Sequence, residues 1–196
     1  MNHSNPRLPE VIGDDLEDIE KALTRNLTPY YELVHKIARH ILFSGGKRLR
    51  PLLMILSARI NGYRGNEGTT LSTVFEYLHA ATLLHDDLVD DATVRRGKKV
   101  AHLMWDNATA VLVGDFLLAR SLSIAAATGR PAVVKIIARI TEDMSQGEIH
   151  QLDRKGHLDL SEAEYMELIR RKTAELLKGA CRVGAIIADA DKEKET

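Results

Sequence analysis

Apolar side chains recur every three or four positions along most of the chain, which is the spacing that places them on one face of an α-helix. Between Leu71 and Leu84, for example, Val74, Phe75 and Leu78 fall on the same side. No segment alternates apolar and polar residues in the way that predicts a β-strand. The pattern therefore predicts an all-α fold.

Breaks in this pattern divide the chain into the expected helices. Gly129-Arg130-Pro131 is a turn signal between two of them, and Ser161 with Glu164 has the capping-box spacing at the start of another. There is no internal repeat and no linker composition, so residues 1–196 are expected to form a single domain. The expected helices cover residues 14–26, 30–43, 51–60, 71–84, 109–127, 133–152 and 162–178, with a further helical segment at 176–187.

An acidic run, Asp14-Asp15-Leu16-Glu17-Asp18, is expected to open the first helix. Acids in a first turn suit the positive end of the helix dipole and can cap it. The run matches the pattern Asp-Asp-x-x-Asp, but no cationic cluster follows it. We therefore assign it no catalytic role.

Composition limits the classes of function. With 196 residues, 44% hydrophobic and 5% aromatic, the chain fits one large helical domain or part of a bigger protein. Its net charge of −1 gives no reason to expect a nucleic-acid partner. The single cysteine, Cys181, excludes an intramolecular disulfide and fits a cytoplasmic location, with core packing as its expected role. Asp115 and Arg120 interrupt the longest apolar stretch, so no membrane span is expected.

A second acidic run lies at the end of the apolar segment, between Leu83 and Asp91. Residues four apart share a helix face, so Asp86 and Asp90 are expected on one face and Asp87 and Asp91 on the next. Acids at a helix C-terminus repel one another and the negative end of the dipole. Mg²⁺, which binds one or two carboxylates together with waters and phosphates, is the natural counter-ion.

Two basic clusters complete this picture. One follows the acids within eight residues, and the other adjoins Gly45-Gly46, where a tight turn meets the start of a helix. Cations beside a helix N-terminus form an anion site. Acids that hold metal together with these cations predict a diphosphate site. The two clusters are Arg95, Arg96, Lys98 and Lys99, and Lys47, Arg48 and Arg50.

These motifs together resemble the trans-type polyprenyl diphosphate synthases. The resemblance covers residues 16–191 and rests on the order and spacing of its motifs. It implies antiparallel helices around a deep central cavity, and the head-to-tail condensation of isopentenyl diphosphate with an allylic diphosphate. The matching motifs are Gly45-Gly46-Lys47-Arg48-Leu49-Arg50-Pro51, His79, His85-Asp86-Asp87-Leu88-Val89-Asp90-Asp91 with Ala92-Thr93-Val94-Arg95-Arg96-Gly97, Gly114-Asp115, Gly147-Glu148 and Lys172-Thr173.

The resemblance also implies roles for single residues. Asp86 and Asp90 would bind Mg²⁺, with Asp87 in support, and these three with Arg95 form the expected catalytic group. The residues that would hold isopentenyl diphosphate are Lys47, Arg50, His79 and Arg96. Those that would hold the allylic diphosphate are Arg95, Lys172 and Thr173. Small side chains at Ala81 and Thr82 leave the tail pocket open, which favours a long, octaprenyl-like product.

The sequence departs from the family pattern at one point, because no second Asp-Asp-x-x-Asp follows late in the chain; Asp189 and Asp191 do not match it. We therefore expect the N-terminal part of a longer synthase, lacking the C-terminal helices and unable to catalyse efficient turnover alone. It is expected to form a homodimer or to pair with a full-length synthase.

Two alternatives remain open at this point. His85-Asp86 in a helical chain could belong to an HD-type metal phosphohydrolase, although that class gives no role to Lys47, Arg50, Arg95 and Arg96. The other alternative is a non-catalytic subunit that binds diphosphates or pairs with a longer synthase. Zinc is not expected, since no His-Glu-x-x-His occurs among the eight histidines.

Overall fold

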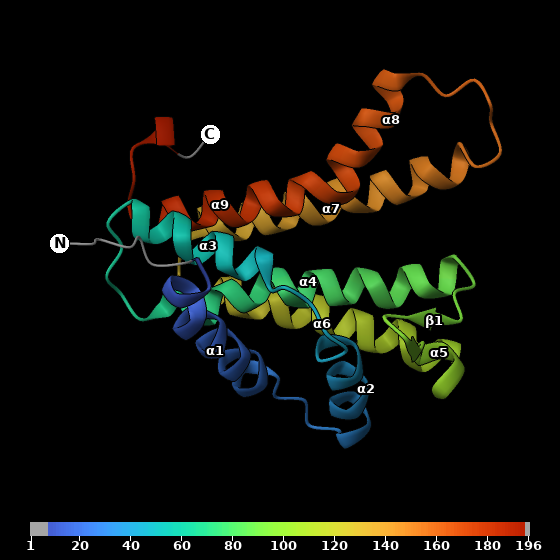
Figure 1. The fold of residues 1–196 in the computed structure, drawn as a ribbon, viewed down its shortest axis with the longest axis horizontal. Coiled ribbons are helices and arrows are strands. Elements are labelled where there is room, and N and C mark those ends of the chain that lie inside the picture. Colours follow the sequence, from blue (N-terminus) through green and yellow to red (C-terminus); the bar gives the residue numbers. More distant parts are fainter. Residues whose placement is uncertain (1–7, 195–196) are drawn as a thin grey trace.

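The computed structural model describes the backbone of residues 8–194 and the side chains of residues 12–193. These residues form an all-α fold, in which long helices run alongside one another and one two-stranded hairpin lies at the edge (Figure 1). The helices are α1 (Leu8–Asn26), α2 (Glu32–Leu42), α3 (Leu49–Ile60), α4 (Glu67–Val89), α5 (Ala101–Met104), α6 (Asn107–Ala127), α7 (Pro131–Asp153), α8 (Glu162–Ile169), the π-helical turn η1 (Arg170–Ala174), α9 (Glu175–Ile187) and the short 3₁₀ turn η2 (Lys192–Lys194). The strands are β1 (Val94–Arg95) and β2 (Lys98–Lys99), which pair antiparallel.

Helix α4 is the centre of the fold. It contacts α1, α2, α3, α5, α6 and α9, and every residue from 71 to 78 is buried. Other helices thus surround this half of α4, and they bury even its polar residues Ser72, Thr73 and Glu76. Its second half is buried on one side only, so the acids at its end reach a cavity.

Helix α6 lies along α4 and is apolar around most of its circumference (Figure 1). Val113, Leu117 and Ile124 are buried in the core, whereas Leu112 is 66% exposed and Leu122 37% exposed. Among the described residues, α6 is the one helix long and apolar enough to cross a bilayer, with 39% of that window buried. Length and composition do not separate a core helix from a membrane span.

The first helix begins earlier than expected, at Leu8 rather than Asp14. The acidic run therefore lies in the interior of α1, and the proposed capping of a first turn is wrong. Asp15 is buried and pairs with Arg59 of α3 through both carboxylate oxygens. The local sequence could not show this partner, which is distant along the chain.

Helix α4 ends at Val89, so one expected face of acids does not form. Asp90 is the C-cap residue, and Asp91 has a left-handed conformation with φ +49°. Asp91 is therefore not stacked above Asp87. No strand was expected anywhere in the chain, but the basic segment that follows α4 forms the β1–β2 hairpin.

Two expectations about the C-terminal half have different outcomes. The capping box is confirmed. The Ser161 hydroxyl accepts from the Glu164 backbone N–H, and the Glu164 carboxylate accepts from the Ser161 backbone N–H. The expected continuous helix from 162 to 178 is wrong, because η1 interrupts it with a π-helical turn. Cys181 is half-buried, and burial raises the pKa of its thiol.

Candidate functional site

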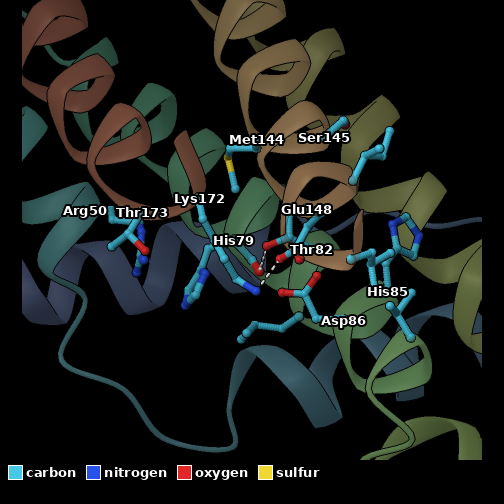
Figure 2. Close-up of a pocket in the computed structure, with 14 residues that line it drawn as sticks. Arg50, His79, Thr82, His85, Asp86, Met144, Ser145, Glu148, Lys172 and Thr173 are labelled. Atoms are coloured by element: carbon cyan, nitrogen blue, oxygen red, sulfur yellow. Dashed lines mark hydrogen bonds and ion pairs between the residues drawn. The ribbon is translucent and has the colours of Figure 1, made fainter. Parts of the chain in front are cut away.

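A cavity of about 380 Å³ opens where the acid-bearing end of α4 faces α7 and η1 (Figure 2). Its walls come from four elements: α3, α4, α7 and η1. The lining combines one acid pair with arginine, histidine, lysine, serine and threonine side chains and with apolar residues. The polar lining residues are Arg50, His79, Thr82, His85, Asp86, Ser145, Glu148, Lys172 and Thr173.

Arg50 lies near the start of α3 and reaches the cavity without a carboxylate partner of its own. Its Nε is buried and has no hydrogen-bond partner among the described residues, and burial lowers the pKa of its guanidinium. A buried, unpartnered donor is costly unless something binds it. Arg50 is therefore prepared to bind an anion.

His79 faces the same region from α4, seven residues before Asp86. Burial, followed by the charges of Arg50 and Arg96, lowers the pKa of His79 to about 3. The imidazole is therefore neutral near pH 7. It can donate one hydrogen bond to an anion but supplies no positive charge in the ligand-free state.

Asp86 and Glu148 extend into the cavity from α4 and α7, and Lys172 lies beside them (Figure 2). The Lys172 Nζ is 2.5 Å from Glu148 Oε1 and 3.1 Å from Gln151 Oε1. Burial raises the pKa of Asp86 to about 7; the negative charge of Glu148 adds to this, and Lys172 acts against it. Two carboxylates held this close repel one another when both are ionised, so a bound cation would stabilise them.

The position of Lys172 depends on a close backbone approach. A Cβ at Gly147 of α7 would lie 2.9 Å from Arg171 Cβ and 3.3 Å from the Lys172 backbone nitrogen. Only glycine lets η1 pack this tightly on α7. The π-helical turn then directs Lys172 and Thr173 into the cavity, and such turns occur often at functional sites.

The basic hairpin is arranged differently from the sequence expectation. Asp87 is 3% exposed at its side chain, and its Oδ1 accepts from Arg95 Nε at 2.8 Å and pairs with Arg95 Nη2 at 2.7 Å. Arg95 is thus held by Asp87, and neither of them lines the cavity. Asp90 and Lys47 are exposed and also lie outside the lining.

Arg96 belongs to the same edge, although it too is outside the cavity lining. A Cβ at Gly46 would lie 3.1 Å from Arg96 Nη1, so the hairpin reaches back to the Gly45-Gly46 turn. The two basic clusters that the sequence analysis paired are therefore neighbours in space. Of the expected substrate-binding residues, Arg50, His79, Lys172 and Thr173 line the cavity itself.

Gly114-Asp115 has a structural explanation. A Cβ at Gly114 would collide with the His85 imidazole, so the glycine makes room for this ring between α4 and α6. The His85 Nε2 lies 3.2 Å from the Val111 carbonyl oxygen and 3.4 Å from Asp115 Oδ1. These contacts give His85 a role in packing α6 against the cavity wall.

A smaller pocket of about 70 Å³ adjoins the main cavity and shares Thr82, His85, Met144 and Ser145 with it. Its lining includes Ala81 and Thr82 of α4, Leu118 of α6 and Met144 of α7. An open tail pocket beside residues 81 and 82 stays a prediction.

A family described as "Polyprenyl synthetase" matches residues 31–196. This chain belongs to the polyprenyl synthetase family. Within it, the chain is 34% identical over 189 residues to the octaprenyl diphosphate synthase of Escherichia coli (strain K12), covering 96% of this chain and 58% of that protein. It is 37% identical over 179 residues to the heptaprenyl diphosphate synthase component 2 of Geobacillus stearothermophilus, covering 91% and 56%.

Solved structures of the family agree with this fold. A polyprenyl synthase from Caulobacter crescentus CB15, crystallised with calcium and isoprenyl diphosphate, is 38% identical and superposes with a TM-score of 0.91, covering 97% of this chain and 60% of that one. A decaprenyl diphosphate synthase from Rhodobacter capsulatus is 37% identical with a TM-score of 0.90, covering 95% and 58%. The chain thus has the isoprenoid synthase fold and spans about 58% of the length of the relatives that it matches.

Family membership decides one question that the sequence left open, because it gives no support to the HD-type phosphohydrolase. Sequence reasoning also missed a residue of the site, since Glu148 was matched only as part of a motif and received no role. The signal was present: Gly147 inside a helix, directly before an acid, indicates a close backbone approach.

Proposed function

We propose that this chain forms the diphosphate- and metal-binding part of a trans-prenyltransferase, which condenses isopentenyl diphosphate with an allylic diphosphate. The observation that supports it is the convergence of Asp86, Arg50 and Lys172 from three separate elements on one cavity. Cations around such a cavity would stabilise the negative charge on a departing diphosphate. Its apolar wall would keep water away from the reactive carbon.

We propose Mg²⁺ as the metal, held by Asp86 and Asp90 at the end of α4. The described residues contain no group of three or more His, Cys, Asp or Glu side chains that could hold an ion. An open site with one or two carboxylates fits Mg²⁺, which keeps waters and substrate phosphates in its shell. The metal would neutralise diphosphate charge, while Arg50 and Lys172 would orient the anion and neutral His79 would donate a hydrogen bond to it.

Calorimetry with inorganic pyrophosphate in the presence and absence of Mg²⁺ tests the binding site directly. We expect binding that requires Mg²⁺ and is lost in Arg50→Gln. A second assay with both prenyl substrates and Mg²⁺ measures turnover, which we expect to be inefficient for the 196-residue chain. Absence of Mg²⁺-dependent pyrophosphate binding would reject the proposal, whereas robust condensation would reject the expected inefficiency. Binding without turnover would favour the subunit alternative.

We propose a long-chain product for the active enzyme, since the side chains of Ala81 and Thr82 beside the smaller pocket are small and would leave room for a growing tail. The octaprenyl, heptaprenyl and decaprenyl synthases among the relatives support this class. Replacing Ala81 with Phe in a full-length relative carrying these helices should shorten its product. An unchanged product would place the limit elsewhere, at Leu118 or Met144.

We also propose that the chain forms a homodimer through α6. Leu112, Ala119 and Leu122 are exposed and recur at helical spacing on one face of this apolar helix. Light scattering should show a dimer that Leu112→Glu converts to a monomer. Leu158→Glu, at a position that is fully exposed on a loop, is the matched control. A monomeric wild-type chain would favour pairing with a longer synthase instead. The cytoplasmic location, which this experiment does not test, stays a prediction.

A further inference from the structure

Arg48 differs from the cations on either side of it in the chain. Lys47 is exposed and Arg50 lines the cavity, whereas the Arg48 side chain is 5% exposed and does not reach the cavity. Its backbone is left-handed, with φ +51°. A non-glycine residue in this conformation is strained, so contacts elsewhere must stabilise it.

Those contacts come from three separate helices. The Arg48 Nε donates to Glu20 Oε1 of α1 at 2.6 Å, and its Nη1 donates to Glu76 Oε1 of α4 at 2.6 Å. Its Nη2 donates to the Leu42 carbonyl at the end of α2 at 2.7 Å. The guanidinium thus caps the C-terminal end of α2 and binds two carboxylates. The side chain of one of them, Glu76, is 8% exposed.

The turn itself has few other restraints. Gly45 and Gly46 have φ +105° and +154°, and a Cβ at Gly45 would contact nothing within 4 Å. Gly45, in open space, imposes little order, whereas Gly46 has the Arg96 and Arg48 guanidinium groups beside it. The direction in which the chain leaves this turn, and hence the position of Arg50 two residues after Arg48, depends on the fixed point at Arg48.

We propose that Arg48 is a positioning residue, whose buried guanidinium ties the Gly45–Arg50 turn to α1, α2 and α4 and so places Arg50 for a diphosphate. This inference rests on the proposed function for its consequence, although the anchoring is a property of the ligand-free chain. Arg48 is not itself a diphosphate ligand, since each of its three nitrogens donates to a partner inside the protein and its side chain is buried outside the cavity lining.

Glu76→Gln separates positioning from charge. Burial lowers the pKa of the Arg50 guanidinium, and Glu76 lies close enough for its negative charge to act against this lowering. Removing this charge should strengthen attraction for an anion if charge alone matters. If Glu76 acts by holding Arg48, the same change should weaken binding of magnesium pyrophosphate, by about tenfold given the sensitivity of such sites to small displacements.

The matched control is Glu17→Gln, which removes one charge from an exposed ion pair with Lys21 on α1. Arg48→Lys is the second variant, because a single ammonium cannot bridge both carboxylates and the carbonyl. All affinities are measured by calorimetry well below each variant's own unfolding midpoint. A role limited to global stability would lower that midpoint and leave the affinity unchanged.

Backbone order provides a test without ligand. ¹⁵N relaxation measures the backbone order parameters of Gly45, Gly46 and Lys47. In Glu76→Gln and Arg48→Lys these order parameters should fall from about 0.85 to below about 0.6. In Glu17→Gln they should not change. Unchanged order parameters, or tighter pyrophosphate binding in Glu76→Gln, would overturn the positioning role. Failure of the wild-type chain to bind magnesium pyrophosphate would instead overturn the proposed function, while the order parameters still decide the anchoring.

Discussion

Two helices of this protein carry the same Asp-Asp-x-x-Asp pattern in different surroundings. In both, the second acid is buried and pairs with an arginine from another element. Asp15 of α1 pairs with Arg59 of α3, and Asp87 at the end of α4 pairs with Arg95 of β1. The first acids differ, whereas the last acids, Asp18 and Asp90, are both exposed. Asp14 and Asp18 are exposed on the surface of α1, whereas Asp86 lines a cavity with Arg50 and Lys172. The pattern thus supplies an anchor at its second acid, and the surroundings of its first acid decide whether it forms a site.

The largest contrast should come from removing the two anchors. Asp87→Asn should lower the free energy of unfolding by about 3 kcal/mol, since it leaves Arg95 without its buried partner. Asp15→Asn should lower the free energy of unfolding by only about 1 kcal/mol, because the side chain of its partner Arg59 is 54% exposed and can bind water instead. The Arg95 side chain is only 30% exposed. Urea unfolding of both variants measures this difference. Equal losses would mean that burial of the arginine does not distinguish the motifs.

The outer acids should separate the motifs in binding. Asp86→Asn should weaken Mg²⁺-dependent pyrophosphate binding by about a hundredfold, or roughly 2.7 kcal/mol, because it removes a metal ligand inside the cavity. Asp14→Asn makes the same chemical change on a solvated face and should leave the affinity unchanged. Calorimetry at one fixed Mg²⁺ concentration compares them. A similar effect in both variants would indicate general electrostatics in place of a metal site.

Glycines near the two motifs provide a contrast of opposite sign. Gly114→Ala should destabilise the fold by about 1 to 3 kcal/mol, because its Cβ would collide with His85 beside Asp86. Gly13→Ala, next to the α1 motif, meets nothing within 4 Å and should stabilise α1 by about 0.5 to 1 kcal/mol. Thermal unfolding midpoints test both signs. Stabilisation by Gly114→Ala would show that the His85 ring can move aside freely.

The smallest expected effect is a pH dependence that belongs to the α4 motif. Burial and Glu148 raise the pKa of Asp86 to about 7 from an ordinary 3.8, so the folded chain binds more protons than the unfolded chain between these values. This stabilising contribution is complete below about pH 4 and is lost as pH rises through about 7. Without metal, Asp86→Asn should therefore match wild type near pH 4 and become more stable than wild type as pH rises, by about 1 kcal/mol at pH 8 after allowing for solvent screening.

Urea titrations at each pH give the difference in unfolding free energy between wild type and Asp86→Asn. This difference reports Asp86, because His79 is present in both proteins. The lowered pKa of His79 acts oppositely, since that stabilising contribution is present above about pH 6.5 and is lost as pH falls through about 3. Asp14→Asn is again the control. A constant difference between wild type and Asp86→Asn across this pH range would contradict the raised pKa.

Much of the fold could be predicted because its signals are local. The apolar spacing of residues 71–84 predicts α4, and Ser161 with Glu164 predicts the start of α8, since both depend on residues three or four apart. The π-helical turn η1 could not be predicted in this way. It forms where Gly147 of another helix lets the backbone approach closely, which no local pattern encodes.

The site divides in the same way. The sequence by itself determined which charged residues are present and that Asp86 ends an apolar helix near Arg95 and Arg96. Only the tertiary structure decided that Arg48 lies inside and Arg50 faces the cavity, and that Glu148 joins Asp86. The physical reason is that burial and ion pairing depend on partners distant along the chain, such as Glu20 and Glu76, whereas helix formation depends on near neighbours.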